Sequence, residues 1–411
     1  MDLRPPALVA PFRGERYRAA LSLSDVLAPP YDVISPAERS AFAARHAYNV
    51  VRVILPEGDG DRYQRAAALL QDWRQRGVLV PDPGDGLYVV RQRFALAPGV
   101  WHQRTGLLAA VAAESFGEGR VKPHERTHPG PKADRLALLR ATGTMCEALL
   151  MLSRDTAGLL QERLAVVAAS KPLAQGELAG VEVTLWRTPA EEAAQLVSAA
   201  SAEPLYIADG HHRYETAVAY RGENPKASHT LALIVPMGDP GLIILPTHRL
   251  VAGRPVGTEV TAALAQHFTV QPLAPGADLA AALESVPARG GCLLVLRDRA
   301  YRLARREGTV PPELKDLAPP VRALGVAWTD HLVVPVLRRM AGEAPLGYTS
   351  DAAAALGALA RGEAGAAVLL RPPTVADVLA VADAGAFMPP KATYFTPKVP
   401  SGLVFLRYEA A

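Results

Sequence analysis

The chain has 411 residues, of which 49% are hydrophobic and 21% are charged, and its formal net charge is +3. This composition is typical of a folded protein of two or three domains and excludes a disordered chain. A net charge this small does not by itself indicate nucleic-acid binding. The two cysteines, Cys146 and Cys292, lie far apart in apolar runs. We expect buried free thiols there, not a disulfide or zinc ligands.

The N-terminus has no charged segment followed by an apolar one, and no apolar run is long enough to cross a bilayer. We therefore expect a soluble cytoplasmic protein without a membrane partner. The sequence does not indicate an oligomeric state.

The first part of the chain predicts two helices and a hairpin. Ser35 before Pro36 predicts the start of a helix. Apolar spacing predicts an amphipathic helix over residues 61–77, ending at Gly77, and a hairpin of residues 87–96 and 101–111.

Residues 29–36 (PPYDVISP) form a stiff loop before the Ser35 helix start, because Pro29 and Pro30 restrict the backbone. The loop is either an ordinary approach to the helix or it carries Tyr31 and Asp32 to the mouth of a pocket.

A polar cluster occupies residues 122–135 (KPHERTHPGPKADR), where prolines again stiffen the backbone. Such loops often position functional groups, although many are simply solvated. Glu125, between His124 and Arg126, is a candidate catalytic acid or base. A helix is predicted from Lys132. The candidate ligand-binding residues of this cluster are His124, Arg126, Thr127, Lys132 and Arg135.

Alternating strands and helices are expected next: a buried strand over 145–152, a helix over 156–169, a strand over 181–186 and a helix over 189–200.

The most informative stretch is residues 204–217 (PLYIADGHHRYETA). Its first half predicts a strand and its second half a helix, with Asp209 as a possible N-cap and Gly210 allowing a tight turn. His211, His212 and Arg213 then fall in the first helical turn, where the helix dipole disfavours cations. An anion at the helix start would explain them, and Arg213 could add a charge-assisted contact. We interpret this joint as a phosphate or nucleotide site; the alternative is a capped turn with solvated histidines.

Residues 230–235 and 242–245 predict adjacent strands joined by a Gly-Asp-Pro-Gly turn. The second strand leads to a polar tip with His248 and Arg249, which is either a plain strand end or part of the pocket.

The remaining chain predicts further helices and strands. Two helices are expected within 253–290, followed by a hairpin of 293–296 and 301–304; helices over 329–340, 352–359 and 374–384; and a strand over 366–370.

Residues 387–399 (FMPPKATYFTPKV) form a third polar cluster. This tail is either a packing arm or it brings Lys391 and Lys398 to a phosphate and Tyr394 to a base or sugar.

The motifs PPYDVIS, KPHERTHPGPK, YIADGHHRYETA, LPTHR and MPPKATYFTPKVPSGL together resemble the domain of unknown function 1015 family, over nearly the whole chain, with Ala392 where the family pattern has Ser. The strand–DGHHR–helix unit also resembles the ParB/sulfiredoxin superfamily, whose members bind nucleotide phosphates at the corresponding helix start. Sulfiredoxins carry a reactive Cys where this chain has His211, and no basic helix-turn-helix module follows as in ParB proteins. The short run from Asp209 to His211 is similar to that of the free serine kinases.

The resemblance implies an α+β protein with mixed sheets and a central ParB/sulfiredoxin-like unit. We expect an N-terminal α+β segment over residues 1–115, a central core over 116–252 and a C-terminal α+β domain over 253–411. The third cluster, which lies in the C-terminal domain, would return to the site.

The expected function is that of a nucleotide-dependent phosphotransferase acting on a small metabolite, with free serine as a candidate. ATP or ADP and Mg²⁺ would be its cofactors, and no nucleic-acid partner is expected. The candidate catalytic residues are Asp209, Glu125, His211 and His212, with Asp209 also the candidate metal ligand; the nucleotide-binding candidates are Gly210, Arg213, His124, Arg126, Thr127, Lys132, Arg135, His248, Arg249, Lys391, Tyr394 and Lys398.

Three alternatives stay open. The first is a nucleotide-binding switch without turnover, and the second is a metal-dependent hydrolase using Asp209, His211, His212 and His248. The third is a scaffold without a ligand. The spacing of the Asp-Gly-His-His run does not match a common zinc template.

Overall fold

The computed structural model describes residues 5–58, 60–308 and 310–409. Residues 1–4, on which the expected absence of a leader segment partly depends, lie outside the described residues. The chain forms two compact units. The first comprises residues 1–123, 127–243 and 397–411, and the second comprises residues 124–126 and 244–396. The division into three segments expected from the sequence stays a prediction.

Among the described residues of the first unit, nine strands form one mixed sheet. In spatial order these strands are β6 (Val121–Lys122), β11 (Leu205–Asp209), β8 (Leu149–Ser153), β12 (His229–Pro236), β5 (Val100–Ala112), β4 (Tyr88–Ala97), β10 (Val181–Arg187) and β9 (Ala174–Leu178), with β1 (Val9–Ala10) also beside β5. Strands β4 and β5 are the predicted hairpin. Strand β8 pairs in parallel with β12 and antiparallel with β11. The sheet is therefore mixed, as expected for the α+β class.

A smaller sheet of the first unit contains the last strand of the chain. Its strands are β3 (Leu79–Pro81), β2 (Gly14–Tyr17), β21 (Phe405–Arg407) and β7 (Thr144–Met145). The single strand predicted over residues 145–152 is wrong, because β7 and β8 lie in different sheets. Between them, the carbonyl of Cys146 accepts a hydrogen bond from the N–H of Gly402, and the carbonyl of Ala148 accepts one from Arg213. Hydrogen bonds to residues distant in the sequence thus divide the apolar segment into two strands.

Most helices of the first unit were predicted from the sequence, but two short ones, Leu23–Val26 and Val51–Ile54, were not. They are α1 (Leu23–Val26), α2 (Pro36–Arg45), α3 (Val51–Ile54), α4 (Arg62–Gln75), α5 (Pro129–Thr142), α6 (Leu159–Ala168), α7 (Ala190–Ser201) and α8 (His211–Glu223). Ser35 caps α2 and forms a capping box with Glu38. Helix α5 begins at Pro129, before the predicted start at Lys132, because proline is compatible with the first helical turn.

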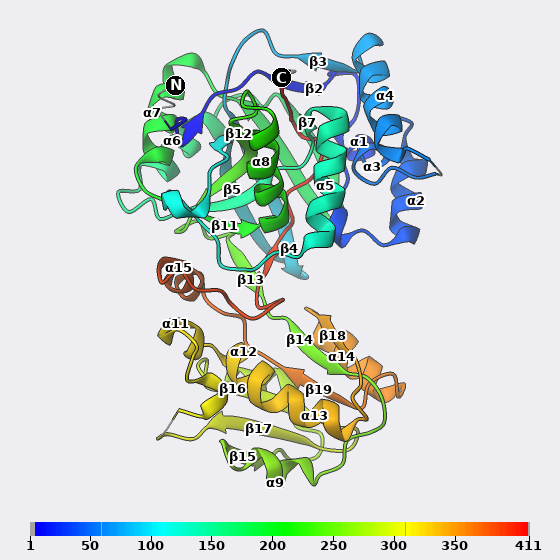
Figure 1. Ribbon diagram of the computed structural model, residues 1–411, viewed down its shortest axis with the longest axis vertical. Helices are drawn as coiled ribbons and strands as arrows, with labels where there is room; N and C mark the ends of the chain where they lie inside the picture. The colour runs from blue at the N-terminus through cyan, green and yellow to red at the C-terminus, as the bar shows by residue number, and fades with distance from the viewer. Residues whose placement is uncertain (1–4, 59, 309, 410–411) are drawn as a thin grey trace. The chain divides into compact units, whose positions relative to one another are not determined.

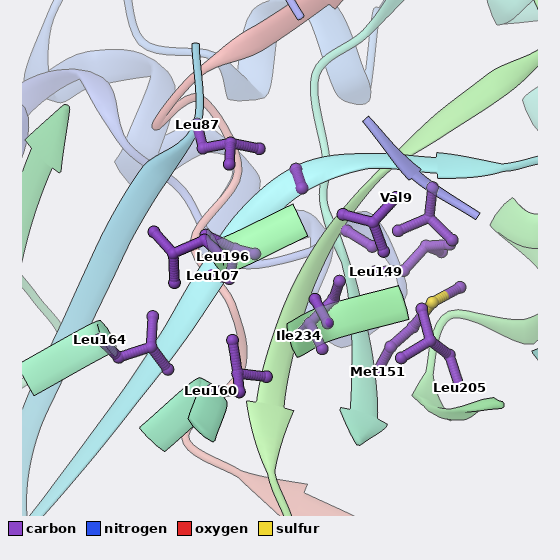
Figure 2. Close-up of a cluster of buried hydrophobic side chains, with 14 of the residues drawn as sticks. Val9, Leu87, Leu107, Leu149, Met151, Leu160, Leu164, Leu196, Leu205 and Ile234 are labelled. Carbon is purple, nitrogen blue, oxygen red and sulfur yellow. The ribbon is translucent and has the colours of Figure 1, made fainter. Parts of the chain in front are cut away.

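The core of the first unit is built from alternate residues of its strands (Figure 2). Leu107 and Ala109 of β5, Leu149 of β8 and Ile207 of β11 lie in one fully buried cluster, onto which Leu160 of α6 also packs. Alternate strand residues point to the same face of a sheet. Strands β8 and β11 are therefore anchored in the core of the first unit.

The second unit has its own sheet and core (Figure 1). Its strands, in spatial order, are β15 (Phe268–Pro272), β17 (Ala300–Arg305), β16 (Gly291–Val295), β19 (Ala366–Leu369), β14 (His248–Val251) and β18 (Leu346–Thr349). Its helices are α9 (Val260–Leu264), α10 (Leu279–Glu284), α11 (Pro319–Arg322), α12 (Gly325–Trp328), α13 (Val334–Met340), α14 (Ala352–Ala360) and α15 (Val375–Asp383). Leu293, Val295, Ala367 and Leu369 pack with Leu359 in its core.

The strand predicted beside β12 over residues 242–245 lies elsewhere. It is β13 (Ile243–Leu245), which pairs with β20 (Tyr394–Thr396). The turn before β13 is tied to β5 instead, because Asp239 accepts hydrogen bonds from the N–H groups of Thr105 and Gly241. No helix among the described residues is both long and apolar enough to cross a membrane.

Candidate functional site

The joint between β11 and α8 positions Asp209. The register of β11 against β8 shifts between Ile207 and Asp209, so a bulge turns the end of the strand. Gly210 follows with φ 95°, and a Cβ at this position would lie 2.7 Å from Cδ2 of Leu149. Only glycine meets both requirements without strain. Helix α8 begins directly afterwards, at His211.

Asp209 does not cap α8, which corrects the prediction from the sequence. The N-cap is Gly210, which has no side chain to accept a capping hydrogen bond. The Asp209 carboxylate instead accepts hydrogen bonds from Lys398 and, at 2.8 Å, from Nη2 of Arg213. The two cationic side chains, and not the helix start, therefore determine which groups the Asp209 carboxylate binds.

All three charged side chains of this group are mostly buried. Their exposed fractions are 17% for Asp209, 15% for Lys398 and 4% for Arg213. Burial raises the pKa of the Asp209 carboxyl, but the charges of Lys398 and Arg213 outweigh burial and hold that pKa well below its usual value. Asp209 is therefore ionised at neutral pH and is a weak proton acceptor.

Gln92 and Arg104, on the β4–β5 hairpin, hold the main chain at Lys398. Gln92 donates to the carbonyl of Lys398 at 2.9 Å. Arg104 donates to the carbonyl of Pro397 at 2.6 Å and to the side-chain oxygen of Gln92. Burial lowers the pKa of Arg104 to about 10, so its guanidinium stays charged at neutral pH. Lys398 is thus positioned by two buried polar side chains.

Arg213 is held in place by the protein itself. Its Nη1 donates to the carbonyl of Ala148 at 2.7 Å, while Nη2 donates to Asp209. Arg213 is therefore well placed to fix the position of the Asp209 carboxylate.

The start of α5 is joined to α8. Glu215 accepts hydrogen bonds from Lys132 at 2.6 Å and from Thr127 at 2.8 Å. The N–H of His128 donates to Nε2 of His212 at 2.9 Å. Burial and the neighbouring His128 lower the pKa of His212. His212 is therefore a neutral ring whose proton lies on Nδ1.

Glu147 joins the PPYDVIS loop to α5. It accepts a hydrogen bond from the N–H of Tyr31 at 2.9 Å and lies 3.4 Å from Nη1 of Arg135. The Arg135 guanidinium lies 4.1 Å from the centre of the Tyr31 ring and donates to the carbonyl of Ile54. Ser401 also donates to Glu147. The first unit therefore brings together parts of four segments that are distant in the sequence.

Other candidates belong to the second unit. His124 lies 3.2 Å from the hydroxyl of Thr393, measured from Nε2, and the Arg126 guanidinium lies 5.3 Å from the centre of the Phe387 ring. Glu125 falls between them in the sequence. Residues 124–126 are thus in contact with residues 387–393 of the polar tail.

His248 and Arg249 are buried within the second unit. Arg249 forms two hydrogen bonds of 2.9 Å with Asp330 and also donates to the carbonyl of Lys391. Nδ1 of His248 accepts from the N–H of Leu370, and burial lowers the pKa of His248 to about 4. These partners give both side chains a role in holding this unit together.

The described residues contain no group of three or more His, Cys, Asp or Glu side chains arranged to hold a metal ion. Both cysteines are free and buried, as predicted. Reasoning from the sequence did not find Gln92, Arg104 or Glu147. Gln92 could have been recognised from the sequence, because it is a polar residue on the strand face that also carries the apolar residues Val90 and Phe94.

The family model described as "Protein of unknown function (DUF1015)" matches residues 9–327, so the chain belongs to this family, as its motifs suggested. Comparison with curated proteins gave no match.

Several solved structures are similar at a low level. A conserved hypothetical protein from Pyrococcus furiosus is 14% identical with a TM-score of 0.38, covering 72% of this chain and 93% of that one. A free serine kinase in complex with AMP is 14% identical with a TM-score of 0.39, covering 72% and 92%. SbnI with a C-terminal truncation, from Staphylococcus aureus, is 13% identical with a TM-score of 0.36, covering 71% and 84%.

Proposed function

We propose that the protein is a nucleotide-dependent phosphotransferase that acts on a small hydroxyl-bearing metabolite. The observation that supports this most is the start of α8, where Lys398 and Arg213 share the carboxylate of Asp209 beside a glycine N-cap. The N–H groups of the first helical turn and the helix dipole favour an anion at this position. A nucleotide phosphate has the charge and the acceptor oxygens that such a site selects.

Each residue of the group has a distinct part in this proposal. The N–H groups of the first turn of α8 and the ammonium group of Lys398 bind phosphate oxygens. Asp209 stays ionised because its pKa is depressed, and it keeps Lys398 in place. Phosphoryl transfer depends mainly on positioning and charge stabilisation, which these groups supply. Glu125 belongs to the second unit, and its role as a catalytic acid or base stays a prediction from the sequence.

The resemblance of residues 209–211 to the free serine kinases makes ATP, ADP and free serine the first compounds to test. Bound Mg²⁺ would neutralise phosphate charge. Both oxygens of Asp209 already have cationic partners, so this carboxylate fits a metal only after it exchanges one of them. We therefore assign no step of the reaction to the metal.

The test is incubation of the full chain with ATP or ADP, Mg²⁺ and serine, followed by measurement of phosphoserine by mass spectrometry. A panel of other hydroxyl-bearing metabolites extends the same assay. We expect one phosphorylated product that depends on the nucleotide. Nucleotide binding without product across the panel would favour the nucleotide-binding switch, and absence of nucleotide binding would refute both functions.

Lys398→Met tests the site itself, since it removes the ammonium group and keeps a side chain of similar length. We expect at least about a tenfold loss of nucleotide affinity, the scale of one charge-assisted contact. Lys226→Met is the matched control, because Lys226 is 56% exposed and lies near Glu409. Equal affinities of the two variants would show that the nucleotide binds elsewhere.

A further inference from the structure

The main chain of Tyr31, in the PPYDVIS loop, is fixed by a buried carboxylate. Its N–H donates to Glu147 at 2.9 Å, and Glu147 is 6% exposed. Pro29 and Pro30 precede Tyr31 and restrict the chain before it. A hydrogen bond to a charged acceptor is stronger than one to a neutral acceptor. The main chain at Tyr31 is therefore held in one position.

The same loop is joined to the segment that carries Lys398. Ser401 follows Lys398 closely in the sequence, and its N–H donates to the carbonyl of Ala28 at 2.8 Å. The hydroxyl of Ser401 donates to the carbonyl of Pro29 at 3.2 Å. All of these residues belong to the first unit. The loop and the lysine of the proposed phosphate site are therefore held by one set of contacts.

The ring of Tyr31 lies against Arg135. The Arg135 guanidinium is 4.1 Å from the centre of the ring, which is a cation–π contact. Arg135 is 5% exposed and donates to the carbonyl of Ile54 at 2.7 Å. Arg135 and Glu147 line a cavity of about 30 Å³ together with Arg213. The ring therefore rests on a side chain that is itself held in place, beside the arginine that binds Asp209.

The hydroxyl of Tyr31 takes no part in the contacts that hold this residue. The side chain is half-buried, but its hydroxyl has no hydrogen-bond partner among the residues that the structure describes. The hydroxyls of Tyr17, Tyr88 and Tyr214, by contrast, donate to protein oxygens. A phenylalanine at position 31 would keep both the main-chain hydrogen bond and the ring contact. The hydroxyl is therefore available to a ligand.

The charges around the Tyr31 phenol favour an anionic partner. Burial raises the pKa of Tyr31 to about 12, and the neighbouring Asp32 adds to this effect. The charges of Arg135 and Arg213 act in the opposite direction, so both guanidinium groups lie near the phenol. Because the phenol keeps its proton at neutral pH, it is a hydrogen-bond donor. Anionic oxygens are the acceptors that form the strongest hydrogen bonds with such a donor.

We propose that the hydroxyl of Tyr31 donates a hydrogen bond to a phosphate oxygen of the nucleotide. Glu147 and Arg135 hold Tyr31 in the position from which it makes this contact. The inference rests on the proposed function, because it adds a contact to the same phosphate site at the start of α8. It explains why the loop carries a tyrosine where a phenylalanine would make the same contacts with the protein.

The test is a calorimetric titration of the wild type and Tyr31→Phe with ADP and, in a second arm, with inorganic pyrophosphate. Tyr31→Phe removes only the hydroxyl. We expect about a tenfold loss of affinity in both arms, the scale of one hydrogen bond to a charged acceptor. A loss with ADP but not with pyrophosphate would place the hydroxyl at the sugar or the base and would overturn the assignment.

Tyr220→Phe is the matched control. Tyr220 is also half-buried, its ring lies 5.7 Å from that of Tyr408, and its hydroxyl has no hydrogen-bond partner in the described part of the chain. It lies in the last turn of α8, at the opposite end from the proposed site. Tyr220→Phe should therefore bind ADP and pyrophosphate like the wild type. An equal loss of affinity in both variants would contradict a specific contact by Tyr31.

Urea midpoints separate a ligand contact from a structural role. Tyr31→Phe should have the midpoint of the wild type, because the hydroxyl holds no other group of the described chain. A lower midpoint with unchanged affinity would show that the hydroxyl serves the fold, and the assignment would be wrong.

Failure of the proposed function and failure of this assignment give different results. If the wild type binds neither ADP nor pyrophosphate, the proposed function is wrong and the assignment to Tyr31 is wrong with it. If the wild type binds ADP and Tyr31→Phe binds it with the same affinity, the assignment alone is wrong.

Discussion

Lys398 donates a hydrogen bond to the carboxylate of Asp209 across 189 positions of sequence. Arg213 holds the other carboxylate oxygen, while Gln92 and Arg104 hold the main chain beside Lys398. Because the side chains of the pair are mostly buried, water compensates poorly when one partner is lost. The stability of this group and its proposed function can therefore be tested with the same variants.

Lys398→Met should lower the free energy of unfolding at pH 7 by about 2 kcal/mol, because Asp209 loses one charge-assisted hydrogen bond and keeps Arg213. Urea denaturation measures this difference. Lys226→Met should stay within about 0.5 kcal/mol of the wild type, as is usual for an exposed residue. Two variants of equal stability would show that the ion pair contributes nothing measurable.

The pH dependence of stability should identify Asp209. Its pKa is depressed in the folded protein, so its ionisation stabilises the fold fully above its unfolded pKa of about 3.9, and this contribution is lost as pH falls further. The difference in unfolding free energy between wild type and Asp209→Asn should be constant above about pH 5 and shrink below it. Urea midpoints between pH 3 and pH 7 provide the measurement. A difference that does not change with pH would contradict the assigned pKa direction.

Gly210→Ala should destabilise the protein by about 2–4 kcal/mol, because the left-handed backbone disfavours Ala and the new Cβ would approach Leu149. Gly158→Ala is the control: Gly158 is also a left-handed N-cap, of α6, and a Cβ there would meet nothing within 4 Å. The control should cost only about 1 kcal/mol. Thermal and urea unfolding distinguish the two, and equal losses would rule out the predicted clash at Leu149.

Gln92→Met should reduce nucleotide affinity although Lys398 is intact, because the carbonyl of Lys398 and the guanidinium of Arg104 both lose a partner. The expected loss of stability is about 2 kcal/mol. Gln175→Met, at an exposed position of β9, should change neither quantity. Calorimetric titration with ADP provides the affinity. Normal affinity in Gln92→Met would mean that Lys398 does not need this support.

Both cysteines should be inert in the native protein. Burial raises the pKa of Cys292 to about 12 and raises that of Cys146 well above its usual value, so little thiolate forms at neutral pH. A colorimetric thiol reagent should detect no thiol before denaturation and two per chain afterwards. Rapid reaction of the folded chain would contradict the buried placement.

Local features of the fold were predictable from the sequence because neighbouring residues determine them. Ser35 and Glu38 form their capping box within one helical turn, and the β4–β5 hairpin follows from alternation around a short turn. The strand-to-helix change around Gly210 was equally clear.

The errors occurred where distant partners compete with local preferences. Asp209 is a good N-cap by residue type, but Lys398 and Arg213 engage its carboxylate more strongly than the first turn of a helix would. The apolar run from Met145 predicted one strand, yet contacts to Gly402 and Arg213 divide it. Neither partner is close in sequence, so no local pattern could indicate them.

The amino-acid order by itself determined the family motifs, the α+β class and the helix start after Gly210, since these depend on residue types and short spacings. Tertiary structure alone decided which side chains meet there. Lys398 reaches Asp209 because the end of the chain is held by Gln92 and Arg104, two buried polar residues whose partners are main-chain carbonyls. Main-chain carbonyls are the same in every residue, so no reading of the sequence can say which of them a buried side chain will bind.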